Sequence, residues 1–334
     1  MSERSFKDQT LLITGGTGSF GQHLAEKVLK SDLFKKVIIF SRDEWKQSQM
    51  REKNPIFTHP NIRYFLGDVR DRERLERAFQ GVDVVVHAAA LKQVPVAEYN
   101  PSEFVKTNIL GAMNVVEAAI DQGVKLSLAL STDKAVGPNN LYGATKLCQD
   151  RIFIASNAYV GQRGYPLFSV CRYGNVAGTR GSVIPIWQKM VEDGQKQIPI
   201  TDSRMTRFWI TLDEAASFVL KTLHGMQGGE IFVPKLPSIR LTDLKEAMAP
   251  QLATEFVGLR EGEKLHESLI SEDESHHTIE QKDRYVVLPI KAFRDTLPAY
   301  DKALGALPSG FSYRSDTNPH FLTSAQLKNF FSTQ

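Results

Sequence analysis

The chain has 334 residues, and 41 lysines and arginines stand against 38 aspartates and glutamates, which gives a formal net charge of +3. A charge so close to balance provides no electrostatic basis for binding nucleic acid or an anionic membrane surface. Hydrophobic residues make up 42 % and charged residues 24 % of the chain, which excludes a disordered, collagen-like or coiled-coil protein.

The first half of the chain alternates short apolar runs with helical patterns. In chain order, strands are predicted at 10–14, 36–40, 62–66, 82–87, 126–132 and 167–172, and helices at 19–30, 72–79, 102–121 and 142–158. Strands that are apolar on both faces and alternate with helices indicate a mostly parallel sheet covered on both sides. Right-handed crossovers then give an α/β fold with a doubly wound, Rossmann-type sheet.

After about residue 175 this alternation ends. Residues 180–185 are predicted to be a loop, 186–193 a short helix and 213–224 a longer helix, and three prolines interrupt the remainder. We expect residues 1–175 to form the Rossmann-type domain, joined by returning elements from about 205–245. Residues 176–334 are expected to form mainly a smaller α/β substrate-binding domain.

A glycine-rich segment follows the first strand and opens the first helix. Glycines at 15, 18 and 21 permit a tight turn, close backbone approach to a pyrophosphate and close helix–strand packing, while the helix N-terminus offers free N–H groups. This strand–turn–helix context predicts a dinucleotide-binding site. Its expected contacts are Thr14, Gly15, Thr17, Gly18, Ser19, Phe20 and Gly21.

Residues after the second strand indicate which dinucleotide is bound. Asp43 could hold the ribose hydroxyls of NAD, whereas Arg42, with Ser41 and Lys46 beside it, suits the 2′-phosphate of NADP. Because Arg42 comes first, we favour NADP, and residues 1–175 become an NADP-binding domain. Further cofactor contacts are expected at later strand ends, from Asp68, Val69, Ala88, Ala89, Ala90 and Lys92.

Tyr142 and Lys146 are four residues apart on a predicted helix and therefore share one face. An ammonium group near a phenol favours the phenolate, so we expect Lys146 to lower the pKa of Tyr142 from about 10. Tyr142 could then act as an acid or base near neutral pH. Lys146 could also hold the nicotinamide ribose.

The fifth strand ends in Thr132, Asp133 and Lys134, at the edge where ligands bind in doubly wound sheets. A hydroxyl and Tyr142 would suffice for hydride transfer alone. The adjacent acid and base therefore suggest a second reaction, in which one group donates a proton and the other removes one. The alternative is a surface ion pair in a loop.

Several stretches resemble known enzyme families. TGGTGSFG and Tyr-x-x-x-Lys resemble extended short-chain dehydrogenases/reductases. More specific are AAALKQVPVAEYNP (88–101), STDKAVGPNNLYGATK (131–146), RYGNVAGTRGSVIP (172–185), RMTRFWIT (204–211) and GLREGEKLHE (258–267). They resemble the soluble, inverting UDP-N-acetylglucosamine 4,6-dehydratases that begin pseudaminic acid synthesis, up to about residue 290. Gly137 departs from the polar residue found in many relatives.

This resemblance implies a three-part reaction with tightly bound NADP that is regenerated in each turnover. C4 of the sugar is oxidised with the help of Tyr142, water is then eliminated across C5 and C6, and hydride returns to C6. Lys134 would remove the C5 proton while Asp133 protonates the departing hydroxyl. Reprotonation on the opposite face inverts C5 and gives UDP-2-acetamido-2,6-dideoxy-β-L-arabino-hex-4-ulose. Membrane-anchored, retaining relatives typically have Met in place of Tyr142.

Binding a nucleotide sugar requires groups for the pyrophosphate, the ribose and the base. Guanidinium groups match phosphate geometry, and the motifs also supply hydroxyl, amide and carboxylate partners. The substrate-binding residues expected within the matching motifs are Lys92, Tyr173, Asn175, Arg180, Thr201, Arg204, Arg207, Arg260 and Glu263. Each has the alternative of a solvated or structural role.

Two other functions share part of this pattern. A UDP-sugar 4-epimerase has the same glycine-rich dinucleotide-binding site and Tyr–Lys pair, but does not need Asp133 and Lys134. A non-catalytic NADP-sensing module commonly lacks the Tyr–Lys pair, which is intact here. No Cys/His cluster has zinc spacing, so no metal is expected.

Location and assembly are also expectations. No apolar run reaches about 18 residues, the length of a membrane span, and the first ten residues are polar. Two cysteines do not make a disulfide framework, and Cys148 is expected to pack as a small apolar residue. We expect a cytoplasmic homo-oligomer, a dimer or hexamer by family resemblance, with no nucleic-acid or membrane partner.

Overall fold

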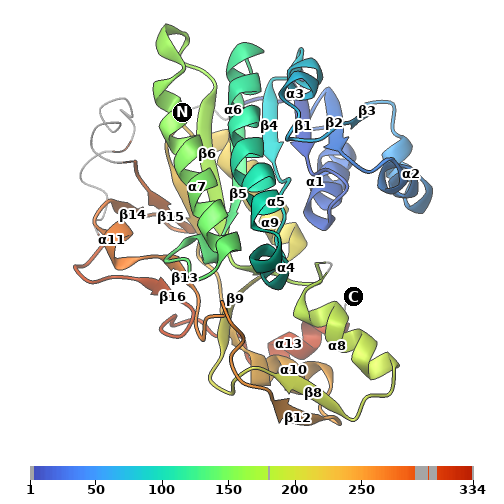
Figure 1. Cartoon of the computed structure of the whole chain (residues 1–334), viewed down its shortest axis with the longest axis vertical. Coiled ribbons are helices and arrows are strands. Elements are labelled where there is room, and N and C mark those ends of the chain that lie inside the picture. Colours follow the sequence, from blue (N-terminus) through green and yellow to red (C-terminus); the bar gives the residue numbers. More distant parts are fainter. Residues whose placement is uncertain (1–3, 180, 290–299, 301–306, 333–334) are drawn as a thin grey trace.

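The computed structural model describes residues 4–179, 181–289, 300 and 307–332. Its main layer is a nine-stranded sheet in the order β14-β15-β10-β6-β5-β4-β1-β2-β3 (Figure 1). The strands are β1 Thr10–Thr14, β2 Lys36–Ser41, β3 Ile62–Leu66, β4 Val84–His87, β5 Leu126–Thr132, β6 Leu167–Tyr173, β10 Ile231–Pro234, β14 Thr278–Glu280 and β15 Arg284–Val287. The α/β class and Rossmann-type sheet are confirmed.

The sheet is parallel from β3 to β10 and ends in two antiparallel strands. β15 pairs antiparallel with β10, and β14 pairs antiparallel with β15. All five residues of β1 are buried, as expected of a strand covered on both faces. β10 comes from the range 205–245, whereas β14 and β15 come from farther along the chain.

Helices cover both faces of the sheet. α6 packs beside α3 and α7 on one face, and α1 packs beside α9 on the other (Figure 1). In α1, Leu24, Ala25, Val28 and Leu29 are buried, which is the spacing of one helix face. The helices of this part are α1 Ser19–Lys30, α2 Glu44–Lys53, α3 Arg72–Phe79, α4 Val94–Tyr99, α5 Pro101–Phe104, α6 Gly111–Asp121, α7 Leu141–Ala155 and α9 Leu212–Gly225.

The remaining elements lie beyond the carboxyl ends of the parallel strands (Figure 1). A second core packs Trp187 and Trp209 with apolar residues of these elements. The strands form the small sheets β11-β9-β7, β12-β8 and β13-β16. These elements are β7 Asn175–Val176, α8 Val183–Glu192, β8 Gln197–Ile200, β9 Thr206–Ile210, β11 Ser238–Arg240, α10 Leu241–Met248, β12 Ala253–Phe256, β13 Ser268–Ile270, α11 Glu272–Ser275, β16 Tyr313–Arg314 and α13 Ser324–Ser332.

Two local predictions were wrong. The helix expected at 102–121 is interrupted by a π-helical segment, η2 (Val105–Leu110), in which Asn108 bonds to the backbone N–H and C=O of Leu91. The loop expected at 180–185 is already helical from Val183, because Pro185 is tolerated in the first turn of a helix. The other single-turn segments are η1 Pro55–Thr58, η3 Asp133–Ala135, η4 Ser156–Ala158 and η5 Gly161–Arg163.

The described part of the chain has no helix whose length and hydropathy suit it to cross a bilayer. Cys148 and Cys171 are both free thiols. Cys171 is buried, but Cys148 is exposed, so its expected packing was wrong. The buried face of α7 includes Lys146, Gln149 and Asp150, and Cys148 lies off that face.

Candidate active site

The glycine-rich turn after β1 brings backbone close to backbone. Gly15 has a φ of +65°, and a Cβ there would lie 2.8 Å from the Ala89 Cα. A Cβ on Gly21 would lie 2.6 Å from the Gly16 Cα. Gly18 is the N-cap of α1. Because glycine has no side chain, the first N–H groups of the helix receive no side-chain hydrogen bond from it. The turn therefore has the shape and the N–H donors that a pyrophosphate requires.

Neighbouring side chains connect this turn to the ends of β4 and β6. Thr14 Oγ1 lies 2.8 Å from His87 Nδ1 and accepts a hydrogen bond from Ala89 N at 3.3 Å. Phe20 stacks on Tyr173 with 6.3 Å between ring centroids. Thr17, Ser19 and Ala88 are partly buried, whereas Ala90 is exposed. All these cofactor candidates therefore lie on or beside the carboxyl edge.

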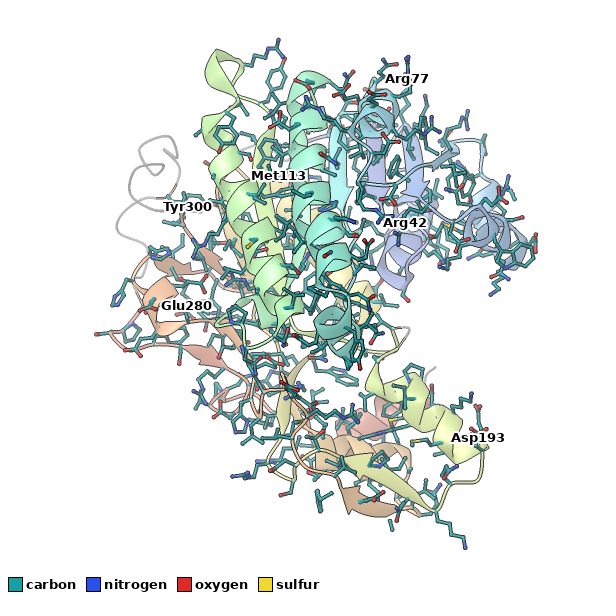
Figure 2. All side chains as sticks on the ribbon, in the orientation of Figure 1. Arg42, Arg77, Met113, Asp193, Glu280 and Tyr300 are labelled. Atoms are coloured by element: carbon teal, nitrogen blue, oxygen red, sulfur yellow. The ribbon has the colours of Figure 1, made fainter. Side chains whose placement is uncertain are left out.

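The residues after β2 include the two candidates for contact with the cofactor ribose, Asp43 and Arg42, and their surroundings differ. Asp43 is the N-cap of α2, where it accepts from Lys46 N at 3.0 Å and pairs with Lys46 Nζ at 2.9 Å. Ser41 is buried and its Oγ accepts from Gln47 Nε2 at 3.0 Å. The Arg42 side chain is half exposed (Figure 2). Of the four expected contacts Ser41, Arg42, Asp43 and Lys46, Arg42 therefore has the most exposed side chain.

Asp68 and Val69 lie at the end of β3. Asp68 Oδ2 is 3.6 Å from Arg42 Nη1 and accepts from Arg70 Nη2 at 2.8 Å. Burial alone would raise the pKa of Asp68, but the hydrogen bonds from Arg70 lower it overall. Val69 is buried, and its carbonyl oxygen accepts from Asn114. Asp68 thus joins Arg42 and Arg70 in one ion-pair network beside the proposed dinucleotide-binding site.

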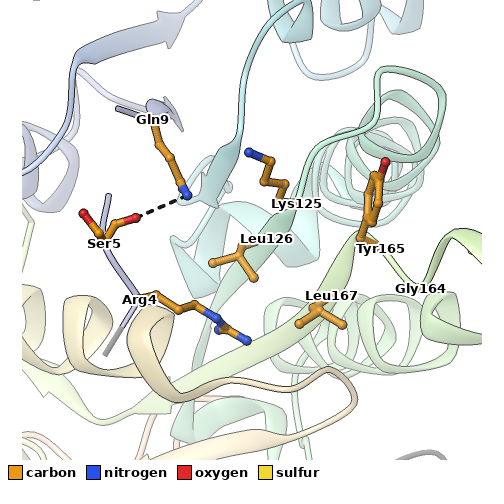
Figure 3. Close-up of a pocket in the computed structure, with 8 residues that line it drawn as sticks. All are labelled: Arg4, Ser5, Gln9, Lys125, Leu126, Gly164, Tyr165 and Leu167. Carbon is orange, nitrogen blue, oxygen red and sulfur yellow. Dashed lines mark hydrogen bonds between the residues drawn. The ribbon is translucent and has the colours of Figure 1, made fainter. Parts of the chain in front are cut away.

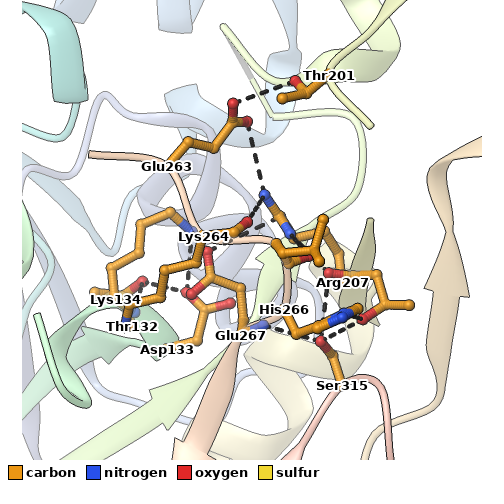
Figure 4. A network of polar contacts seen from close by, with 12 residues as sticks. Thr132, Asp133, Lys134, Thr201, Arg207, Glu263, Lys264, His266, Glu267 and Ser315 are labelled. Atoms are coloured by element: carbon orange, nitrogen blue, oxygen red, sulfur yellow. Dashed lines mark hydrogen bonds and ion pairs between the residues drawn. The ribbon is translucent and has the colours of Figure 1, made fainter. Parts of the chain in front are cut away.

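Asp133 and Lys134 form an ion pair at the end of β5, and its surroundings exclude a simple surface pair. Asp133 Oδ1 lies 3.1 Å from Lys134 Nζ and accepts from Thr132 Oγ1 at 2.9 Å (Figure 4). Asp133 is fully buried, and its Oδ2 has no hydrogen-bond partner among the described residues. A second carboxylate, Glu267 Oε1, lies 3.3 Å from Lys134 Nζ.

Tyr142 lies close to this pair. It is buried, and its phenol lies near Thr132 at the end of β5. Burial raises the pKa of Tyr142 to about 12, although the nearby Lys134 opposes that shift. The expected lowering by Lys146 was therefore wrong for this state of the protein. The structure instead brings Lys134 near the phenol.

Lys146 is buried and its ammonium is hydrogen-bonded elsewhere. Its Nζ donates to the Leu130 carbonyl oxygen and to Gln149 Oε1, both at 2.6 Å. Burial lowers the pKa of Lys146 to about 8, with partial opposition from Asp150. Lys146 and Tyr142 do share the buried face of α7, as their spacing predicts.

A second polar cluster lies beside the ion pair and comes from residues beyond 200. Thr201 Oγ1 donates to Glu263 Oε2 at 3.2 Å, and Arg207 Nη2 lies 3.7 Å from Glu263 Oε1 (Figure 4). Arg207 also donates to the carbonyl oxygens of Thr206, Leu265 and Lys264. Its guanidinium is therefore largely occupied by backbone.

Other substrate-binding candidates are spread more widely. Arg204 is 69 % exposed and makes a bidentate pair with Asp202, and Arg260 and Asn175 are exposed. Lys92 lies near enough to Lys134 that partial burial and repulsion between the two ammonium groups lower its pKa. Arg180 lies outside the described residues.

Sequence reasoning missed Glu267, Lys264 and Asn108. Glu267 and Lys264 lie within the GLREGEKLHE stretch, and Lys264 Nζ donates to Val136 C=O at 2.7 Å, which joins that stretch to the loop after Asp133. Asn108 donates to Thr145 Oγ1 at 3.0 Å. The one signal for Glu267 in the sequence was its place in a motif that matches the family. Its partner Lys134 lies 133 residues earlier in the chain, so nothing in the sequence indicated their contact.

A surface cavity of about 420 Å³ lies at the opposite edge of the sheet (Figure 3). Leu126 and Leu167, the first residues of β5 and β6, line it together with Arg4 and Lys125. Arg4 donates to the Leu223 carbonyl oxygen and Lys125 pairs with Asp83, so both cations are engaged.

Within the described residues no group of His, Cys, Asp and Glu could hold a metal ion.

Comparison with known proteins gives consistent matches. A family model described as "Polysaccharide biosynthesis protein" matches residues 11–289. The chain is 50 % identical over 327 residues to the UDP-N-acetylglucosamine 4,6-dehydratase (inverting) of Campylobacter jejuni subsp. jejuni serotype O:2, covering 96 % of this chain and 97 % of that protein. It is 43 % identical to the UDP-glucose 4-epimerase of Rickettsia massiliae, covering 84 % and 83 % respectively.

Among solved structures, the X-ray structure of Pen from Bacillus thuringiensis matches with a TM-score of 0.88. The two chains are 36 % identical, and the match covers 99 % of each. The similarity therefore extends over the elements on both sides of the candidate site.

Proposed function

Because this chain belongs to the polysaccharide biosynthesis protein family, we propose that it is a UDP-N-acetylglucosamine 4,6-dehydratase that inverts C5, a lyase of the nucleotide-sugar type. The observation that supports this best is the buried Asp133–Lys134 pair, with 3.1 Å between Oδ1 and Nζ, beside Tyr142 at the carboxyl edge. An acid and a base held together suit elimination of water from adjacent carbons.

The residues divide the proton transfers between them. When bound, a nicotinamide dinucleotide would accept hydride from C4 and return it to C6. Tyr142 receives the proton of the C4 hydroxyl directly or through water. Lys134 takes the proton from C5, and Asp133 gives a proton to the C6 hydroxyl, which leaves as water. Reprotonation of C5 on the opposite face gives the inverted 4-keto-6-deoxy product.

NADP is the proposed cofactor, remaining bound through turnover. The close backbone contacts at Gly15 and Gly21 fit a pyrophosphate, and Asp43 is already engaged by Lys46, which leaves Arg42 for a 2′-phosphate. Lys146 would exchange its Leu130 contact for the nicotinamide ribose. The wider cradle comprises Thr14, Thr17, Gly18, Ser19, Phe20, Ser41, Asp68, Val69 and Ala88–Ala90.

The nucleotide sugar would lie between this cradle and the segments beyond 200. Thr201 and Glu263 form a hydrogen-bonded pair beside Arg207, close to the proposed acid and base. Tyr173 is the last residue of β6, and Lys92 follows the end of β4, so both would approach the ligand from the carboxyl edge of the sheet. Arg204, Arg260 and Asn175 would have to reach the ligand from exposed positions.

A 4-epimerase is the alternative, because relatives with that name share this fold and 43 % of aligned residues. Epimerisation requires oxidation and reduction at C4 only, so it does not use the buried Asp133–Lys134 pair as an acid and a base. This pair favours the dehydratase.

The test is incubation of the purified protein with UDP-N-acetylglucosamine in deuterated water. Dehydration gives a 4-keto-6-deoxy sugar with deuterium at C5 and inverted C5 stereochemistry, without consumption of added reductant. An unlabelled C4 epimer would support the alternative, and an unchanged sugar would contradict both.

We further propose that the enzyme is a cytoplasmic homo-oligomer that supplies pseudaminic acid synthesis. Leu110 and Met113 are 46 % and 45 % exposed around the start of α6, which is consistent with apolar contacts between subunits. Light scattering of the purified protein would distinguish a dimer or hexamer from a monomer.

A further inference from the structure

Glu267 reaches the acid–base pair from a distant part of the chain. Its Oε1 lies 3.3 Å from Lys134 Nζ, on the same ammonium that Asp133 Oδ1 contacts at 3.1 Å (Figure 4). The Glu267 side chain is only 2 % exposed, and Oε2 has no hydrogen-bond partner among the described residues. Two carboxylates therefore share one ammonium in a site largely removed from water.

The position of Glu267 is fixed by its backbone. Glu267 N donates to Ser315 Oγ at 3.0 Å, and Ser315 N donates to Glu267 O at 2.9 Å. Ser315 Oγ lies 2.7 Å from Thr206 Oγ1, so the backbone of Glu267 is tied to β9. Its contact with Lys134 consequently does not depend on a mobile surface side chain.

The charges around Lys134 come from every neighbouring segment. The carboxyl groups of Asp133 and Glu267, the basic side chains of Arg207, Lys92 and Lys264, and the Tyr142 phenol all lie near Lys134. Burial alone would lower the pKa of Lys134, but the two carboxylates outweigh burial and raise it. In the free protein Lys134 is therefore an ammonium, which cannot remove a proton.

We propose that Glu267 is a positioning residue that holds Lys134 Nζ against Asp133 and sets the protonation of the pair. This inference rests on the proposed dehydratase function. One proton moves from the Lys134 ammonium to Asp133, which yields a neutral amine and a neutral carboxylic acid with no other reactant. That single transfer produces both the base for C5 and the acid for the C6 hydroxyl. Glu267 remains anionic and accepts another N–H, which orients the free amine.

The first experiment measures the pH dependence of kcat for Glu267→Gln. The amide retains an oxygen acceptor but removes a negative charge, so every remaining group of the cluster binds protons less tightly. Both limbs of the pH profile should move to lower pH by about one unit or more. Glu267→Asp, which keeps the charge, should restore the wild-type limbs. Exposed Glu255→Gln on β12 is the matched control and should change nothing.

A second readout is independent of activity. Acetic anhydride acylates only the unprotonated amine, and peptide mass spectrometry measures acylation at Lys134 as a function of pH. In Glu267→Gln the midpoint at Lys134 should fall, while the midpoint at exposed Lys7 stays constant. If that variant does not fold, Ser315→Ala takes its place, because it removes the hydrogen bond to Glu267 N and should also lower the Lys134 midpoint.

The outcomes separate the two proposals. Unchanged pH limbs and an unchanged Lys134 midpoint in a folded Glu267→Gln protein would overturn the role of Glu267, even if dehydration is observed. A wild-type protein that forms no 4-keto-6-deoxy sugar would overturn the proposed function, whereas a shifted Lys134 midpoint would still support the charge-setting role of Glu267.

Discussion

The ammonium of Lys146 donates a hydrogen bond to the carbonyl oxygen of Leu130, with 2.6 Å between the two atoms. Tyr142, one helical turn earlier on α7, is instead influenced by Lys134. The two lysines thus have different tasks in the free protein, since Lys134 is paired with carboxylates while Lys146 is paired with neutral acceptors. This division leads to separable effects of mutation.

Tyr142→Phe should slow C4 oxidation by about 10²- to 10⁴-fold, because it removes the group that receives the hydroxyl proton. Burial raises the pKa of the Tyr142 phenol to about 12 in the free protein, and binding of the positively charged oxidised nicotinamide should lower it. Ultraviolet titration with and without cofactor measures this shift, and Tyr142→Phe should abolish it. An unchanged first-turnover rate in the variant would contradict the assigned role.

Asp133→Asn and Lys134→Ala should each reduce formation of the 4-keto-6-deoxy sugar by about 10²- to 10⁴-fold. Neither residue is in the glycine-rich turn, so the cofactor should stay bound. Reduced nicotinamide should accumulate in Asp133→Asn, since oxidation at C4 can precede the blocked elimination. Its near-ultraviolet absorbance reports this step, and wild-type turnover in either variant would refute the assignment.

Arg42→Ala should weaken NADP binding more than NAD binding, because only NADP carries the 2′-phosphate. Calorimetric titration with both cofactors gives the comparison. Arg77→Ala is a suitable control, because Arg77 is an exposed residue at the far end of α3 (Figure 2). Equal losses for NADP and NAD would count against the phosphate contact.

Gly143→Ala should damage the site from within α7. A Cβ at Gly143 would overlap the Lys134 carbonyl oxygen, so the helix or the loop must move. We expect a loss of about 1–3 kcal/mol in the free energy of unfolding and a fall in kcat. Denaturant unfolding and product assays measure both. Gly225→Ala is the control, since its Cβ would meet no atom within 4 Å.

Glu274→Gln should destabilise the fold by about 1–3 kcal/mol, because fully buried Arg172 loses its bidentate carboxylate and keeps Asp150, 3.3 Å away, as a charged partner. Burial alone would raise the pKa of Glu274, but Arg172 lowers it overall. A lowered carboxyl pKa contributes stability above the unfolded value of about 4.3, and this contribution is lost as pH falls.

The difference in unfolding free energy between wild type and Glu274→Gln should therefore narrow below about pH 4. Glu272→Gln, an exposed change on the same short helix, should match the wild type throughout. A constant difference between pH 7 and pH 3 would show that charge pairing with Arg172 is not the cause.

The sequence predicts those elements whose signals are local. β1, β3, β5 and α1 have the predicted bounds, because each is a mainly apolar run or one helix face between clear breakers. β14 and β15 were missed, because strands of three or four residues show almost no period, and because β15 joins the sheet by pairing with β10, which lies about fifty residues earlier in the chain, while β14 pairs only with β15. The π segment depends on the tertiary contacts of Asn108 with Leu91.

The same distinction applies to the site. Gly15, Gly21 and the Asp133–Lys134 pair were recognisable because their chemistry lies within one short stretch. The sharing of Lys134 with Glu267 could not be predicted, since folding alone brings residues 134 and 267 together. Likewise, a guanidinium in a matching motif does not reveal whether it faces a ligand, the backbone like Arg207, or solvent like Arg204.

The central sheet also limits how this chain can be divided. β10 lies against β6, and β15 and β14 extend the sheet from there, although all three are encoded after the proposed substrate-binding segment has begun. A fragment ending at residue 175 would leave the hydrogen-bonding edge of β6 bare and the apolar residues of β10 missing. Such a fragment should aggregate when expressed alone, so transplanting a new specificity into this scaffold requires exchanging loops within an intact chain.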